Sequence, residues 1–88
     1  MSREETNKLR YTIALIAEFA LKFGLSERQS YNYMRRFKGV DFLHQYYDVL
    51  HTQSFDDATE SIAIICQQNG GRINPYRQWY YTTAQILI

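Results

Sequence analysis

The 88-residue sequence contains one cysteine, one proline and only four glycines. The lone cysteine, Cys66, excludes an intramolecular disulfide and a zinc site made of several thiolates, and it favours a reducing compartment. The single proline, Pro75, excludes a helix through Asn74, because the residue before a proline is pushed towards extended geometry. A domain of this length buries only about 60% of its unfolded-chain surface, so its stability is marginal and a partner can matter.

A long apolar run is also missing. The first eight residues contain no apolar signal core. The most apolar stretch, residues 11–23, is interrupted by Thr12, Glu18 and Lys22 and is too short to cross a bilayer. With 45% hydrophobic and 22% charged residues, residues 1–88 have the composition of one globular domain. We therefore expect a soluble, cytoplasmic protein that does not bind membranes.

Positive charge is absent from the middle of the chain. Residues 39–71 carry five acidic residues and no lysine or arginine, whereas residues 1–38 carry eight basic residues and four acidic ones. The overall net charge of +1 conceals this split. Such a split can steer a protein partner or a second copy of the chain, as in a homodimer. Attraction between neighbouring helices within one molecule explains the split equally well.

Start and stop signals divide most of the chain into four helices. Thr6 is expected to cap the first helix and Gly24 to end it, while Ser26 and Gln29 form a capping box for the second. Acidic residues after Ser54 suit the first turn of the fourth helix. The helices are expected at residues 7–23, 27–38, 40–50 and 55–68. The fold class predicted is all-α, a compact bundle of four short helices over residues 7–71.

The predicted core follows helical spacing. In the first helix the i, i+3, i+4 stripe is Leu9, Ile13, Ile16, Ala20 and Phe23, widened by Leu15, Phe19 and Leu21. We expect this helix to be central and packed on more than one side, with Glu18 and Lys22 paired on its remaining wet strip. In the fourth helix the residues expected to face the core are Phe55, Ala58, Ile62, Ile65 and Cys66.

Residues 72–88 form an aromatic-rich tail without a clear terminating signal. A short fifth helix and a strand both fit this composition. We expect the tail to fold back on the four helices, because an exposed apolar end would be adhesive.

Both histidines lie in the third predicted helix. At about 100° per residue, His44, Asp48 and His51 share one side of it, and two imidazoles with a carboxylate are accepted ligands for zinc or ferrous iron. One helix seldom presents three ligands to one ion, because His44 and His51 are separated by about 10 Å along the axis. We interpret this side as a solvated helix face, and metal binding remains the alternative.

No pattern in the sequence indicates catalysis. His51 lies near the end of its helix, where the helix dipole favours an imidazolium, so a capping role explains it. The nearest hydroxyl, Ser54, is expected to be a helix cap, and Gly70-Gly71 is a helix stop and not a phosphate-binding loop. We therefore expect a protein that is not an enzyme and has no cofactor.

A basic patch lies on the second predicted helix. Arg28 and Arg35 share one face of it, with Arg36 and Lys38 adjacent, and such a patch suits phosphate contacts in RNA. A helix-turn-helix reader of DNA does not fit, because the helix after the turn at Gly39 carries aspartates and no basic residue. RNA binding through this helix is therefore an alternative function.

Three segments, residues 25–31, 38–43 and 46–53, resemble a family of short bacterial helical proteins classed as a domain of unknown function. The resemblance covers roughly residues 7–71, and its most specific mark is the Tyr-Asp-Val-Leu-His-Thr-Gln stretch at residues 47–53. Members are often encoded beside ADP-ribosyltransferase-like proteins. The resemblance implies an accessory or antitoxin-like role and brings no catalytic residues.

The sequence therefore predicts a non-enzymatic module that binds another protein. The protein partner implied by the resemblance is ADP-ribosyltransferase-like. The residues expected to bind it are Tyr47, Asp48, His51 and Gln53, with Arg28 and Arg35 as a separate electrostatic patch.

Overall fold

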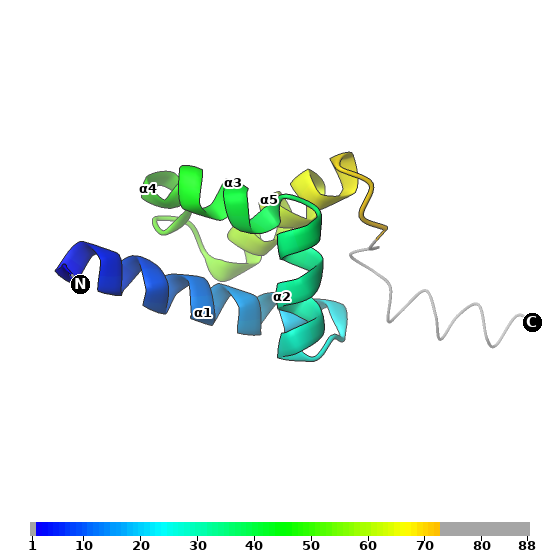
Figure 1. Cartoon of the computed structure of the whole chain (residues 1–88), viewed down its shortest axis with the longest axis horizontal. Coiled ribbons are helices and arrows are strands. Elements are labelled where there is room, and N and C mark those ends of the chain that lie inside the picture. Colours follow the sequence, from blue (N-terminus) through cyan, green and yellow to red (C-terminus); the bar gives the residue numbers. More distant parts are fainter. Residues whose placement is uncertain (1, 73–88) are drawn as a thin grey trace, which may run out of the picture.

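The computed structural model describes residues 2–72, and within them the chain forms five α-helices and no strand (Figure 1). The all-α prediction is confirmed. The tail predicted at residues 72–88 lies, except for Arg72, outside the described residues. The helices are α1 (Arg3–Phe23), α2 (Glu27–Arg36), α3 (Gly39–Gln45), α4 (Tyr47–Leu50) and α5 (Phe55–Gln68).

The long first helix forms one side of the molecule, and α3 and α4 run along the opposite side (Figure 1). α2 connects the two sides at the C-terminal end of α1, and it contacts both α1 and α3. α5 packs against α1, α2 and α3. Consequently α4 and α2 lie at opposite ends of the bundle, which separates the two surfaces predicted to bind a partner.

Local capping chemistry sets most of the helix boundaries. The backbone N–H of Gln29 donates to Ser26 Oγ at 3.0 Å, and Gln29 Oε1 accepts from the Ser26 N–H at 2.9 Å, which confirms the capping box. Gly24 ends α1 with φ +68°, a left-handed conformation that costs glycine little. The predicted cap at Thr6 is wrong. α1 begins one turn earlier, where Ser2 Oγ accepts from the Glu5 N–H at 3.1 Å.

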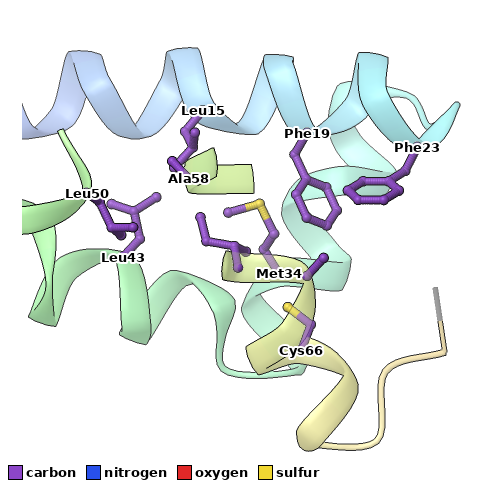
Figure 2. Close-up of a cluster of buried hydrophobic side chains, with 10 residues drawn as sticks. Leu15, Phe19, Phe23, Met34, Leu43, Leu50, Ala58 and Cys66 are labelled. Atoms are coloured by element: carbon purple, nitrogen blue, oxygen red, sulfur yellow. The ribbon is translucent and has the colours of Figure 1, made fainter. Parts of the chain in front are cut away.

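One continuous hydrophobic core joins all five helices. Figure 2 shows side chains of α1 projecting towards the other helices, with Met34, Leu43 and Ala58 among their neighbours. Several side chains are fully buried, so removing one would leave a cavity and cost about 2–5 kcal/mol for a leucine truncated to alanine. The core cluster consists of Leu15, Phe19, Phe23, Met34, Leu43, Leu50, Ala58, Ile62, Ala63 and Cys66.

The side of α1 that faces the core matches the predicted apolar surface only in part, since Ala20 and Phe23 of the predicted stripe are buried. Leu9, Ile13 and Leu21 are exposed, whereas Leu15 and Phe19 are fully buried. α1 is apolar around most of its circumference, so its periodicity alone does not determine which side the other helices cover. The expectation that α1 packs on more than one side agrees with its contacts to both α2 and α5.

The turn between α2 and α3 differs from the prediction that Lys38 and Gly39 together stop α2. Lys38, and not Gly39, takes the left-handed conformation, with φ +73°. Gly39 is the first residue of α3 and lies against α5, where a Cβ would be 2.8 Å from Cys66 Sγ and 3.1 Å from Ile62 Cγ2. Glycine is thus needed at this position for close approach of α3 to α5.

Candidate functional site

The helix predicted over residues 40–50 is divided at Tyr46. This residue ends α3 and precedes α4, with φ −112° and ψ +23°. Hydrogen bonds continue through the junction, because the Tyr46 N–H donates to the Phe42 carbonyl and the Leu50 N–H donates to the Tyr46 carbonyl. The division therefore bends the chain without separating the two helices. The prediction of one straight helix is wrong at this point, because Tyr46 leaves the helical region of backbone space.

An aromatic cluster, formed by Tyr11, Tyr47, His51 and Phe55, fastens α4 to α1. The Tyr11 ring meets the edge of Tyr47 at a centroid distance of 5.4 Å and stacks on Phe55 at 6.1 Å. Tyr47 in turn stacks on His51 at 4.6 Å with only 11° between the ring planes. Such pairs contribute about 0.5–1.5 kcal/mol each beyond the burial of their area. The cluster therefore packs Tyr47 and His51 against Tyr11 of α1.

Tyr11 also anchors this end of the molecule through its hydroxyl. Tyr11 Oη donates to the Leu50 carbonyl at 3.0 Å, which satisfies a carbonyl at the C-terminal end of α4. Burial, and to a smaller extent the nearby Tyr47 phenol, raise the pKa of Tyr11 above its ordinary value. Lys8 Nζ lies 5.5 Å from the centroid of the Tyr47 ring, within the range of a cation–π contact. Tyr11 and Lys8, both on α1, thus contact the Tyr47 ring.

His51 has the capping role that the sequence predicts. It is the C-cap of α4, and its Nδ1 lies 2.7 Å from the Tyr47 carbonyl. A carbonyl oxygen only accepts hydrogen bonds, so Nδ1 carries the proton in this contact. The ring is exposed, with its remaining nitrogen, Nε2, not engaged in this bond. The geometry accounts for His51 without a substrate or an ion.

Several side chains of this region remain accessible to a partner. The α4 surface consists of Tyr47, Asp48, Val49, His51 and Gln53. Tyr47 is half-buried and the other four are exposed, Val49 with 57% of its surface accessible. The structure therefore brings the predicted residues Tyr47, Asp48, His51 and Gln53 together within one helix and the turn after it.

Sequence reasoning missed three contributors to this region. Val49 is an apolar side chain on the α4 surface, and Tyr11 forms its support. Phe55 was predicted to face the core, but it is 42% exposed. It lies at the edge of the aromatic cluster because it is the first residue of α5. At this point the chain has only begun to approach α1. The clue in the sequence was the aromatic residue beside the Ser54 cap.

The histidine stripe does not form a metal site. Within residues 2–72, no group of three or more histidine, cysteine or acidic side chains is placed where it could hold an ion. His44 lies on α3, whereas Asp48 lies on α4 and His51 is its C-cap. Cys66 is fully buried among apolar side chains, and burial raises the pKa of its thiol to about 11. Within the described residues, the stripe is therefore not gathered into a set of metal ligands.

A groove of about 260 Å³ lies between α1 and α5, and its lining includes both charged and apolar side chains. Lys22 Nζ is 3.3 Å from Asp56 Oδ1 and 3.7 Å from Glu60 Oε1. The predicted pair of Lys22 with Glu18 is thus replaced by ion pairs to α5, because α5 brings carboxylates within reach of the lysine. The groove is lined by Glu18, Leu21, Lys22, Phe55, Asp56 and Thr59.

Arg28 and Arg35 are exposed on α2, at the end of the bundle away from α4 (Figure 1). Arg36 and Lys38 are also exposed, and Arg36 lies over the ring of Phe37 at 5.3 Å. The structure therefore does not join the two arginines to the α4 surface. They form a second surface, as the sequence predicts.

The chain matches the model of an uncharacterised protein family, described as Protein of unknown function (DUF3791), over residues 10–69. The match covers the five helices except for residues 3–9 at the start of α1, and it includes the whole α4 surface. Comparisons with curated proteins and with solved structures find no match. No helix within residues 2–72 is long and apolar enough to span a membrane.

Proposed function

The chain belongs to the DUF3791 family of proteins of unknown function, and from this premise we propose that it is a non-enzymatic module that binds another protein through the α4 surface. The observation that carries the proposal is the exposure of Val49 and Asp48 on a helix whose Tyr47 is held in place from α1. Interfaces favour such a mixture, with an apolar or aromatic centre and a polar rim.

Rigidity of the support favours binding. Each rotamer-rich side chain that becomes ordered on association costs about 0.5–1.5 kcal/mol. Tyr47 and His51 are already stacked on each other, and Tyr47 is also held by Tyr11. Binding of a partner to this surface therefore needs little further ordering of side chains, and its entropic cost is small.

A binding role without catalysis suits the chemistry of the site. His51 uses Nδ1 to cap α4, and Cys66 is buried with its thiol held protonated by a raised pKa of about 11. A reactive cysteine needs an exposed thiolate instead. In the proposal the chain is no enzyme and uses neither a cofactor nor a metal ion.

The partner that we propose is an ADP-ribosyltransferase-like protein, for which the chain would act as an accessory or antitoxin-like protein in the bacterial cytoplasm. The support for this partner is the sequence resemblance described above. Arg28 and Arg35 provide a separate electrostatic surface in this scheme. RNA is the less favoured ligand for them, because Asp41 is exposed in the first turn of the helix that follows, and carboxylates repel phosphates.

The test is a calorimetric titration of the chain with the proposed ADP-ribosyltransferase-like partner. We expect a complex at micromolar concentrations. Val49→Asp should weaken it at least tenfold, since a charge placed in an apolar contact of an interface is costly. Ile64→Asp is the matched control, because Ile64 is a similar apolar residue on α5 with 55% of its surface exposed. It should leave the affinity within about twofold.

Failure to form a complex would contradict the proposal, and so would equal losses from Val49→Asp and Ile64→Asp. Circular dichroism of both variants must first show that each keeps its helical content.

A further inference from the structure

The groove between α1 and α5 carries acidic side chains together with accessible apolar ones. Asp56 and Glu60 are exposed, and the one basic residue in the lining, Lys22, is already paired with both. Leu21 is 77% exposed, and Phe55 contributes a second accessible apolar side chain. The groove therefore suits a ligand that carries both positive charge and an apolar or aromatic group.

α2 presents a surface with these properties. We define the arginine face as Arg28, Tyr31, Asn32, Arg35 and Lys38, all of which are exposed. It lies opposite the buried side of α2, which holds Ser30 and Met34. The one acidic residue of α2 is Glu27 in its first turn. The Tyr31 ring therefore lies on the same helix face as Arg28 and Arg35, and Lys38 lies just beyond the end of α2.

The two surfaces point in different directions within one molecule. α2 packs on the side of α1 that carries Ile16, because Ser30 Oγ donates to the Ile16 carbonyl at 2.9 Å. α5 packs near Glu18, two residues later, which is roughly 200° around the helix at about 100° per residue. The arginine face also points away from α1. Consequently the groove and the arginine face of one molecule do not reach each other.

We propose that the groove of one copy of the chain receives the arginine face of a second copy. Tyr31 would lie between Leu21 and Phe55, while Arg28 and Arg35 approach Asp56 and Glu60. The occupant is inferred from complementary charge, since the acidic residues Glu18, Asp56 and Glu60 outnumber Lys22 around the groove and the arginine face contains no acidic residue. The proposal depends on the proposed function only in treating Arg28 and Arg35 as a partner-binding surface.

Such a contact uses two different surfaces, so it is heterologous. After one contact forms, each pair of molecules still has a free groove and a free arginine face, and association continues into short chains or a ring. The surfaces are small and exposed, and specific interfaces usually bury about 1,200–2,000 Å². Association is therefore weak, and it depends on salt because the Debye length falls from about 10 Å at 0.1 M to about 3 Å at 1 M.

The experiment is analytical ultracentrifugation of the full chain with two variants. In the face variant, Arg28→Gln and Arg35→Gln remove charge from α2. In the groove variant, Asp56→Asn and Glu60→Gln remove it from α5. A control variant, Arg3→Gln with Arg10→Gln, loses the same charge from exposed positions on α1.

We expect the wild-type mass to rise above the monomer value of 10.5 kDa with concentration at low salt, and to return to it in 0.5 M salt. The face variant alone and the groove variant alone should associate at least tenfold more weakly, and the control should behave as wild type. An equal mixture of the face and groove variants should form a dimer and nothing larger, because one intact groove meets one intact arginine face.

A wild-type chain that stays monomeric at low salt would overturn the proposal, and so would a mixture that fails to associate. Retardation of a single-stranded RNA that is lost in the face variant, with a monomeric wild type, would assign the arginine face to nucleic acid instead. Val49→Asp should leave self-association unchanged, so this experiment and the partner titration fail independently.

Discussion

The phenol of Tyr11 donates a hydrogen bond to the backbone carbonyl of Leu50, and this 3.0 Å contact ties the shortest helix of the bundle to the longest. α4 has only four residues and no side-chain cap at its start. A helix this short is not stable in isolation. Its position therefore depends on Tyr11, on the aromatic cluster and on the burial of Leu50.

Tyr11→Phe should destabilise the protein and loosen α4. The change keeps the ring contacts and removes one hydrogen bond, so we expect a loss of about 1 kcal/mol in the free energy of unfolding. Urea denaturation measures the loss. Faster hydrogen exchange at His51, whose backbone N–H donates to the Tyr47 carbonyl, would locate the effect at α4. Unchanged exchange at His51 in the variant would contradict the anchoring role of Tyr11.

Stability should fall as the pH rises above about 9. Burial raises the pKa of Cys66 from 9.0 to about 11, although the backbone N–H of Gly39 opposes the shift. The unfolded chain therefore loses this proton more readily, and the folded state becomes less favoured between pH 9 and 11. The shift corresponds to a loss on the order of 2–3 kcal/mol. Urea denaturation at pH 7.5, 9, 10 and 11 measures it.

Cys66→Ala is the control for this pH dependence. The variant lacks the thiol, so its stability should fall less between pH 9 and 10 than that of the wild type, whatever its stability at pH 7.5. The partly buried Tyr11 and Tyr33 also have raised pKa values, and their ionisation continues the decline at higher pH. Identical slopes for the two proteins between pH 9 and 10 would show that the thiol is not shielded from water.

Gly39→Ala should destabilise the bundle, although alanine is normally the better helix former. The added methyl group would lie 2.8 Å from Cys66 Sγ, so α3 and α5 must move apart or repack. Overpacking of this kind costs about 1–3 kcal/mol. Thermal unfolding of the variant should show a lower midpoint. A midpoint equal to or above the wild-type value would contradict the close approach of the two helices.

Lys38→Gly should stabilise the protein slightly. Lys38 is exposed and holds φ +73°, a conformation that costs a non-glycine residue about 1–2 kcal/mol. Glycine removes this cost but makes the unfolded chain more flexible, so a net gain of up to about 1 kcal/mol is expected. Lys38→Ala keeps the strained backbone and removes only the charge. Equal effects of glycine and alanine on the unfolding midpoint would contradict the backbone strain at Lys38.

Features that depend on a few neighbouring residues were predictable from the sequence. The capping box of Ser26 and Gln29 and the end of α1 at Gly24 follow from local hydrogen bonds and backbone preference. The start of α1 was misplaced because Ser2 and Thr6 both suit a cap. The Thr6 hydroxyl instead donates to the Ser2 carbonyl from inside the helix, as threonine often does.

Features that depend on distant residues were not predictable in this way. α1 is apolar around most of its circumference, so its sequence alone did not determine which side is buried. The packing of α5 and α2 buries Leu15 and Phe19. At the candidate site, the capping role of His51 depends only on neighbouring residues and was predicted from the sequence. The contacts of Tyr11 with Tyr47 and Phe55 join segments far apart in the chain, and no spacing rule relates them.

The proposed function is tested most directly by mapping where the proposed partner contacts the chain. Backbone amide signals of the isotope-labelled protein are followed by NMR while the ADP-ribosyltransferase-like partner is added. The account predicts that the largest changes fall at Asp48, Val49, His51 and Gln53. A complex whose changes lie elsewhere, with residues 47–53 unaffected, would contradict the claim that the α4 surface is where this protein binds.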